Sequence, residues 1–272
     1  MFKLALGAGH RLETAGKRCL KALDPNETRE WVLNDRICDK VETLLSGYDG
    51  IEVLRVDDTD GKKNIDLIQR VKAANDFGAD FALSVHHNSG VNGGPGGGIV
   101  AYVGPGVDQI TKDWQKALYD ALIDHTGLRG NRAAPLATGN FYVLNATRMP
   151  SVLLELGFMD SSTDVPIILS EKYADQCAAA IVEVVARKAG LNKKVEKPNM
   201  TEQERFDQMM EDWLARQQEK DPAGWSEADR KWAERNGIIF GDGSGKKMYR
   251  SWCTREQMVA FLHRLADLLT SK

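Results

Sequence analysis

DFALSVHHNSG (residues 80–90) is an apolar run of about the length of one buried strand, and it ends in two adjacent histidines. Similar short runs recur through the first 190 residues, with longer helix-like patterns between them. Several of these runs are apolar throughout, as expected when helices cover both faces of a sheet. The alternation predicts an α/β domain with a mostly parallel six-stranded sheet flanked by helices.

The individual elements can be assigned from the same patterns. The expected strands are FKLALGA, IEVLRV, DFALSV, GIVAYV, FYVL and SVLLEL, and the expected helices lie near residues 25–46, 64–77, 107–127 and 171–188. The first helix is expected to begin with Asp24 as N-cap, Pro25 at the first helical position and Glu27 at the third. Its buried stripe is expected to contain Leu33, Ile37, Val41 and Leu44.

Composition excludes some classes of function. The net charge of −3 lacks the basic surplus of a nucleic-acid-binding protein. No stretch approaches the roughly 18 apolar residues of a membrane span, and the N-terminal run is too short for a signal peptide. We therefore expect synthesis in the cytoplasm, with neither a nucleic-acid nor a membrane partner. The four cysteines form no C-x-x-C pair and are expected to be mostly buried thiols without a function.

The composition changes after Gly190 and predicts a second domain. Residues 191–201 are charged, contain a proline and are expected to be a linker between a catalytic domain at 1–190 and a small helical domain at 202–272. The helical domain holds four of the six tryptophans: Trp213, Trp225, Trp232 and Trp252.

Histidines end two of the predicted strands. His10 follows the first strand, and His86 and His87 end the strand quoted above. The carboxyl ends of parallel strands meet at one edge of a sheet, where sites gather. Neutral imidazole is the commonest protein ligand of zinc, and a catalytic zinc site usually has three protein ligands and one open position. The alternative is that each histidine is a satisfied core or loop residue.

Two glutamates occur in apolar surroundings. Glu30 lies on the buried stripe of the first helix, where an unpaired carboxylate is costly, so we prefer it as the third zinc ligand over Glu27, whose position suits capping. Glu155 lies within the apolar strand SVLLELGF and would take and return a proton beside the metal. Its alternative role is a structural pair with a buried arginine. Together the four residues suggest a hydrolase that uses a water activated by zinc.

At these residues the chain resembles the zinc-dependent N-acetylmuramoyl-L-alanine amidases called amidase type 3, which occur in bacterial autolysins and phage endolysins. The matching elements are GAGH, the Glu30/Asn34 spacing, SVHHNSG and MPSVLLELGFMDSSTD, and they extend to about residue 189. The resemblance implies zinc binding by His10, Glu30 and His86, and catalysis by Glu155. It also implies that the substrate is peptidoglycan, cleaved at the amide between the lactyl group of N-acetylmuramic acid and L-alanine.

Two neighbouring features have no role that the resemblance fixes. We expect His87 to line the cleft and the glycine-rich segment 90–98 to be a connection, the alternative being that this segment leaves space for a glycan or peptide stem.

The tail from about residue 226 resembles a single S-layer-homology module, through WSEADRKWAERNGIIFGDGS and TREQMVAFLHRL. That resemblance implies binding to a secondary cell-wall polymer, with self-association or a small tryptophan core as the alternatives. Without a visible signal peptide, the chain is expected to be a phage or prophage endolysin that acts on the cell wall after its release. Competing functions are a zinc peptidase or deacetylase acting on another bond, and a non-catalytic wall-binding protein with a structural metal site.

Overall fold

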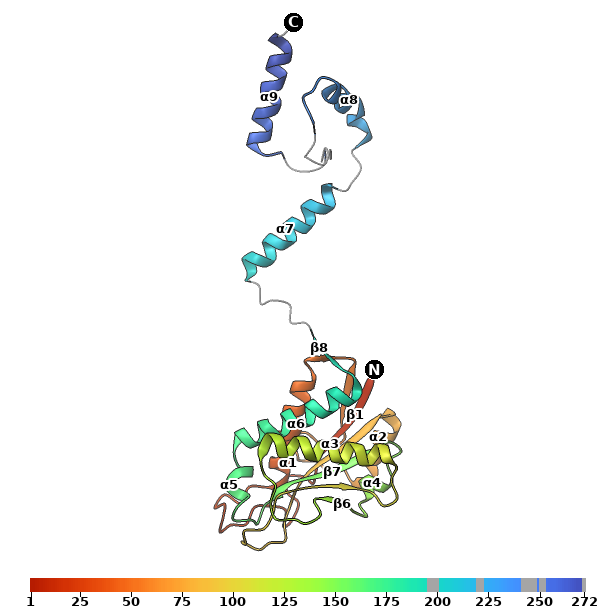
Figure 1. Ribbon diagram of the computed structural model, residues 1–272, viewed down its shortest axis with the longest axis vertical. Helices are drawn as coiled ribbons and strands as arrows, with labels where there is room; N and C mark the ends of the chain where they lie inside the picture. The colour runs from red at the N-terminus through yellow and green to blue at the C-terminus, as the bar shows by residue number, and fades with distance from the viewer. Residues whose placement is uncertain (195–200, 219–222, 241–248, 250–252, 271–272) are drawn as a thin grey trace. The chain divides into compact units, whose positions relative to one another are not determined.

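The computed structural model describes residues 1–194, 201–218, 223–240, 249 and 253–270 (Figure 1). The chain divides into two compact units, the first of which is Met1–Lys194. Residues 195–200 of the expected linker, residues 241–244 of the first tail motif, and Trp252 lie outside the described residues. No helix in the described part of the chain is long and apolar enough to cross a membrane.

A six-stranded sheet forms the centre of the first unit, in the order β3-β1-β4-β7-β5-β6. The strands are β1 (Phe2–Ala8), β3 (Ile51–Arg55), β4 (Phe81–Asn88), β5 (Ile99–Val103), β6 (Leu136–Thr138) and β7 (Ser151–Phe158). Strands β3, β1, β4 and β7 are parallel, β5 is antiparallel to β7, and β6 is parallel to β5. The predicted mostly parallel sheet of six strands is therefore confirmed.

One of the six expected strands is wrong. Residues 142–144 of FYVL belong to a short helix, α4 (Tyr142–Asn145), and the sixth strand is β6 at the edge of the sheet. Leu136 of β6 is 40% exposed, so this strand carries no buried apolar run that could reveal it. Four apolar residues are also too few to separate a strand from a helical turn by their period.

Helices cover both faces of the sheet. Helices α1 (Glu30–Leu45), α3 (Gln109–Thr126) and α6 (Glu171–Ala189) pack together over the large core (Figure 1). On the other face, α2 (Leu67–Phe77) packs against β1 and α4, and α4 packs against β7. The alternation along β1 shows the two faces, because Leu4 and Leu6 join the large core while Ala5 joins the smaller one beneath α2. A four-residue helix, α5 (Val165–Ile168), follows β7.

The first helix begins later than the sequence suggests. Asp24 caps a turn instead of the helix, since its carboxylate accepts the amides of Asn26 at 3.1 Å and Thr28 at 2.7 Å. Glu27 has a φ of 49°, which no helix interior allows, so the capping role expected for it is also wrong. The helix starts at Glu30. At its other end Leu44 is 44% exposed, and Leu45 takes the expected buried position.

The remaining elements are short or belong to the second unit. Strands β2 (Tyr48–Asp49) and β8 (Asn192–Lys193) pair in an antiparallel ribbon. The second unit contains α7 (Glu202–Gln218), the 3-10 turn η1 (Gly224–Ser226), α8 (Glu227–Arg235) and α9 (Arg255–Thr270). Three cysteines, Cys19, Cys38 and Cys177, are buried and Cys253 is exposed.

Candidate metal and catalytic site

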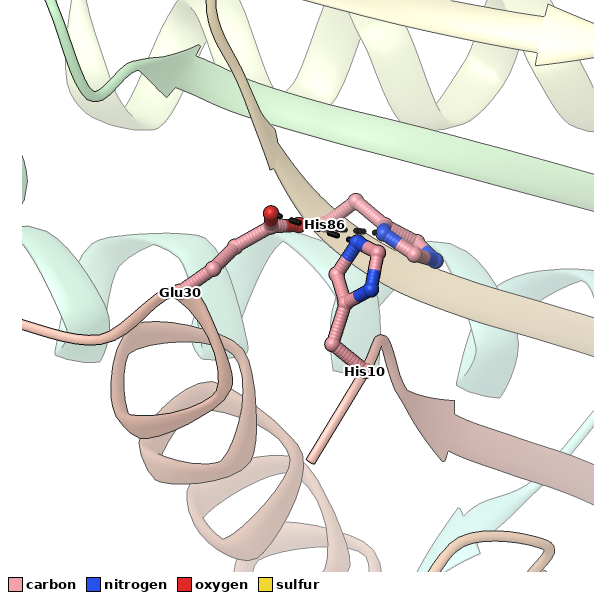
Figure 2. A group of neighbouring side chains, drawn as sticks. All are labelled: His10, Glu30 and His86. Atoms are coloured by element: carbon pink, nitrogen blue, oxygen red, sulfur yellow. Dashed lines mark hydrogen bonds and ion pairs between the residues drawn. The ribbon is translucent and has the colours of Figure 1, made fainter. Parts of the chain in front are cut away.

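Three potential metal ligands meet at the carboxyl edge of the parallel strands. His10 follows β1, Glu30 is the first residue of α1, and His86 lies near the end of β4 (Figure 2). One ligand atom from each side chain lies within 4.8 Å of the other two. The Glu30 carboxylate lies between the imidazoles, with Oε2 at 3.3 Å from His10 Nε2 and Oε1 at 3.1 Å from His86 Nδ1. The grouping expected from the sequence is therefore present, and its role in binding a metal remains a prediction.

The backbone that carries His10 is held by a buried arginine on α2. Arg70 donates from Nη2 to the carbonyl of His10 at 2.8 Å, and from Nη1 to the carbonyl of Ala8. These bonds fix the end of β1 while His10 adopts a φ of 65°, a left-handed conformation that a non-glycine residue rarely adopts. The position before it must be glycine, because a Cβ on Gly9 would lie 2.1 Å from Cε1 of His86. The imidazole of His86 can therefore lie beside His10 only because the residue at position 9 has no side chain.

The Oε1 atom of Glu30 is surrounded by donors. It accepts the backbone amide of His87 at 3.2 Å and the side-chain amide of Asn34 at 3.4 Å, and it faces His86. Glu30 itself is fully buried. Oε1 is thus held both by β4 and by α1, and this prevents the carboxylate from rotating.

The Oε2 atom of Glu30 is different, since it is buried and makes no hydrogen bond. Two cationic or potentially cationic groups lie near it: His10 Nε2 at 3.3 Å and Lys17 Nζ at 3.5 Å. A buried carboxylate oxygen without a hydrogen bond is costly unless a cation satisfies it. The arrangement therefore leaves an anionic oxygen directed toward the space that two imidazoles also face.

The protonation states suit metal binding. Burial alone would raise the pKa of Glu30, but the hydrogen bond and charge of His86, with His10 and Lys17, lower this pKa to about 2. Burial lowers the pKa of His10 to about 4, against the opposing effect of Glu30. Metal ligands must be a deprotonated carboxylate and neutral imidazoles. At neutral pH, Glu30 and His10 are in the states that a divalent cation requires.

Glu155 lies beside this group on the neighbouring strand. It occupies the position of β7 that pairs with His86 of β4, and the two residues line the same cleft. Its Oε2 atom is buried without a hydrogen bond. Burial and the charge of Glu30 raise the pKa of Glu155 to about 7, although His86 and Lys17 oppose the shift. A carboxyl group with this pKa can exchange a proton near neutrality.

The expected alternative for Glu155, a pair with a buried arginine, is not found among the contacts of the described residues. Its placement in the cleft therefore fits a chemical role better than a structural one.

The site opens into a cleft of about 490 Å³, a volume within the usual range for ligand pockets. Its lining includes His10, His86 and Glu155, together with polar loop residues and apolar residues of α2, α4 and the adjoining loops. Three of the apolar lining residues, Leu67, Phe141 and Tyr142, are 53%, 38% and 44% exposed. The cleft can thus hold a polar reacting group at the ligand cluster while an apolar or ring-shaped part contacts these side chains.

His87 and the glycine-rich segment 90–98 both lie next to the ligand cluster in the sequence. His87 does not line the cleft: it is 2% exposed and points to the α1 face of β4, because side chains alternate along a strand. The glycine-rich segment 90–98 is a connection. It is held by Asp160, whose carboxylate accepts three successive backbone amides, those of Gly90, Val91 and Asn92. No residue of this segment lines the cleft that contains His86.

Lys17 and Arg70 also belong to the site, and neither was predicted from the sequence. Lys17 lies in the loop after His10, and Arg70 lies on a helix whose other residues gave no functional signal. Arg70 offered one clue, because it is a charged residue on the face of α2 that also carries Val71 and Ala74, the helix's other buried residues. Lys17 offered none.

Most of the first unit matches the sequence profile of a known protein family. The sequence profile of amidase type 3, described as N-acetylmuramoyl-L-alanine amidase, matches residues 4–187. Among solved structures, the crystal structure of an N-acetylmuramoyl-L-alanine amidase from Clostridium difficile 630 is 26% identical and superposes with a TM-score of 0.63. That match covers 70% of this chain and 97% of the other. Residues 4–187 contain α1, β4, β7 and most of β1, the elements that carry or precede the site residues.

Two relatives are similar in sequence. The N-acetylmuramoyl-L-alanine amidase CwlM of Bacillus licheniformis is 32% identical over 150 residues, which are 55% of this chain and 56% of that protein. The endolysin of Bacillus phage SPP1 is 32% identical over 200 residues, covering 71% of this chain and 69% of the endolysin. The match thus spans little more than half the length of CwlM.

Proposed function

Because the chain belongs to the amidase type 3 family of N-acetylmuramoyl-L-alanine amidases, we propose that it is a zinc-dependent peptidoglycan hydrolase. It cleaves the amide between the lactyl group of N-acetylmuramic acid and L-alanine. The observation that carries this proposal is the convergence of His10, Glu30 and His86 in a cleft that also contains Glu155.

The ligand set fits a catalytic zinc ion. Two imidazoles and a carboxylate are a known set for zinc in hydrolases, and the hydrogen-bond-free Oε2 of Glu30 is an atom that a cation would satisfy. Among the described residues the group contains these three potential ligands and no fourth. A structural zinc site normally has four protein ligands, whereas a catalytic site leaves one position for water or substrate. The composition of the group therefore supports catalysis over a structural role.

When bound, zinc would supply Lewis acidity to the amide carbonyl and lower the pKa of a water in the open position. The protein's own groups then account for the proton transfers. Glu155 is placed on the strand next to His86, and its raised pKa allows it to accept the proton of the attacking water. The same carboxyl group can deliver this proton to the alanine nitrogen as the amide breaks, which leaves Glu155 ready for the next turnover.

The reaction products show which bond of peptidoglycan is cleaved and so separate the amidase from a peptidase or deacetylase. Purified peptidoglycan digested by the full chain should release stem peptides with free L-alanine amino groups and glycans that keep their lactyl groups, as read by mass spectrometry. A zinc chelator should abolish this release, and added zinc should restore it. Shortened stem peptides would identify a peptidase, and free glucosamine amines would identify a deacetylase. Wall retention without any product would identify a non-catalytic wall-binding protein.

We also propose that the protein acts as a phage or prophage endolysin that reaches the wall after the host membrane is opened. The similarity to the endolysin of Bacillus phage SPP1 supports this role. Expression in a susceptible host should leave the culture turbid until a membrane-permeabilising agent is added. Lysis without that agent would contradict the release step.

For the second unit we propose contact with a wall polymer. Trp225 and Trp232 are 85% and 47% exposed, so they do not form the small tryptophan core that was one alternative. Aromatic side chains at binding surfaces are frequent sources of affinity. Trp225→Ala should lower retention on purified cell walls by about fivefold or more, measured by co-sedimentation in the presence of chelator. Ile110→Ala is the control, because it removes an exposed apolar side chain of α3.

The remaining alternative is self-association, which the same samples test by analytical ultracentrifugation. A chain that dimerises through Trp225 and binds walls equally well with or without it would contradict the wall-contact proposal.

A further inference from the structure

His87 and Asn34 form a buried pair directly behind the ligand cluster. His87 Nδ1 lies 2.8 Å from Asn34 Oδ1, and both residues are almost completely buried between β4 and α1. Neither side chain lines the cleft. The proton transfers proposed above do not use either residue. Burying polar side chains is costly unless they form hydrogen bonds, and the hydrogen bonds that these two make lead to the ligand cluster.

The chemistry of the neighbours fixes the direction of each hydrogen bond. The Nδ2 group of Asn34 faces two acceptors, the carbonyl of Gly9 at 3.2 Å and Oε1 of Glu30 at 3.4 Å, so it donates to both. Its Oδ1 atom must therefore accept, and His87 must carry its proton on Nδ1. The Nε2 atom of His87 is then an acceptor, and it is buried without a partner. The neutral imidazole has one N–H group, and it donates this hydrogen to Asn34.

The pair connects to two of the three ligands. Through Asn34 it reaches Oε1 of Glu30 and the carbonyl of Gly9, the residue just before His10. The backbone amide of His87 contacts the same Oε1 at 3.2 Å. With Oε1 held in this way, Oε2 remains the atom available to a cation.

We propose that His87 and Asn34 are positioning residues that set the metal affinity by holding Glu30 and the Gly9–His10 backbone in the ligand-binding orientation. This inference rests on the proposed function, since it requires that His10, Glu30 and His86 bind a metal. It also explains why β4 carries two adjacent histidines near its end: His86 faces the ligand cluster, and His87 supports that cluster from the opposite face of the strand.

Substitutions at His87 separate the hydrogen bond from simple packing. His87→Asn keeps an amide nitrogen bonded to Cγ, as Nδ1 is, and so keeps a donor in place for Asn34. His87→Leu removes the donor and keeps an apolar volume. His87→Gln places its amide nitrogen one atom farther from the backbone, and so retains polarity without the required donor.

The test measures zinc affinity of the full chain by competition with a chelating dye, alongside the melting temperature of the metal-free protein. His87→Leu and His87→Gln should weaken zinc binding by about 10–100-fold, the usual effect of losing a group that orients a ligand. His87→Asn should stay within about threefold of the wild type. Combining His87→Leu with Asn34→Leu should weaken binding no further than Asn34→Leu alone, because His87 acts through Asn34.

The outcomes distinguish this inference from the proposed function. If the wild type binds zinc and a folded His87→Gln or His87→Leu variant binds it equally well, the positioning role is overturned and the zinc site stands. Equal losses in all three His87 variants would also overturn it, because packing alone would then explain the effect. A wild-type chain that binds no zinc would overturn the inference together with the proposed function.

Discussion

Glu155→Gln should lower the rate of amide hydrolysis by about 10²–10⁴-fold, the usual contribution of a positioned general acid or base. Glutamine keeps the size and polarity of the side chain but can neither accept the proton of water nor deliver it to the leaving nitrogen. Zinc content should be unchanged, because Glu155 is not among the three grouped ligands. The rate of release of stem peptides from purified peptidoglycan measures the loss, with Glu183→Gln on the exposed surface of α6 as the control.

The pH dependence of the same two proteins strengthens the test. In the wild type, kcat/KM should fall as the pH decreases through the pKa of Glu155, because the protonated carboxyl group cannot act as a base. That pKa is about 7 in the metal-free chain, and a bound cation would move it lower. The acidic limb of the profile should be absent from the residual activity of Glu155→Gln. If the acidic limb persists unchanged in Glu155→Gln, the limb reflects the titration of another group.

The pH dependence of stability tests the raised pKa of Glu155 without an activity measurement. The folded chain raises the pKa of this group from its ordinary 4.5 to about 7, so the folded state binds the proton more tightly than the unfolded state. The free energy of unfolding of the metal-free wild type should therefore decrease from this source as the pH rises from about 4.5 to 7. Glu155→Gln should lose that part of the pH dependence, measured by urea unfolding at several pH values.

His86→Ala should abolish zinc retention and reduce hydrolysis to background. The substitution removes one of three ligands and leaves Glu30 Oε1 without the imidazole beside it. The side chain of His86 is 17% exposed at the cleft, so its loss should damage the site more than the core. Zinc bound after desalting and the rate of peptidoglycan digestion measure the two effects.

A second histidine–glutamate pair provides a matched control. His125 lies 2.9 Å from Glu183 on α3 and α6, and both side chains are more exposed than those of the site and lie outside the cleft. His125→Ala should therefore keep both zinc and activity. Retention of stoichiometric zinc by His86→Ala would remove this residue from the ligand set, even if activity fell.

The sequence predicted the parallel part of the sheet because its strands are long and apolar. Strands β1, β4 and β7 are buried under helices, and this burial requires the continuous apolar runs by which they were found. The edge strand β6 carries no such run, and α4 is a single helical turn whose apolar residues read equally well as a strand. Local patterns therefore located five of the six strands, including β3 at one edge, and failed at the β6 edge.

The start of α1 shows a different limit. Asp24 and Pro25 have the residue types of a helix start, but the carboxylate of Asp24 caps a turn instead, and the left-handed Glu27 interrupts the chain before Glu30. The predicted stripe nevertheless placed Glu30 on the buried face, since that stripe depends on spacing and not on where the helix begins.

The meeting of His10 and His86 could be anticipated because parallel strands deliver their ends to one edge, and Glu30 was predicted from its place on the buried stripe of α1. The side to which His87 points could have been inferred from alternation once His86 was assigned to the cleft. Its bond to Asn34 could not, because it depends on how α1 packs over β4. Arg70 and Lys17 likewise acquire their roles only when distant segments meet.

An anomalous-difference map at the zinc absorption edge, from a crystal of the full chain, tests the central claim most directly. The account predicts one strong peak within about 2.0–2.2 Å of one atom from each of His10, Glu30 and His86, in the cleft that contains Glu155. A zinc-replete crystal with no peak there, or with its peak bound by other residues, would contradict the account.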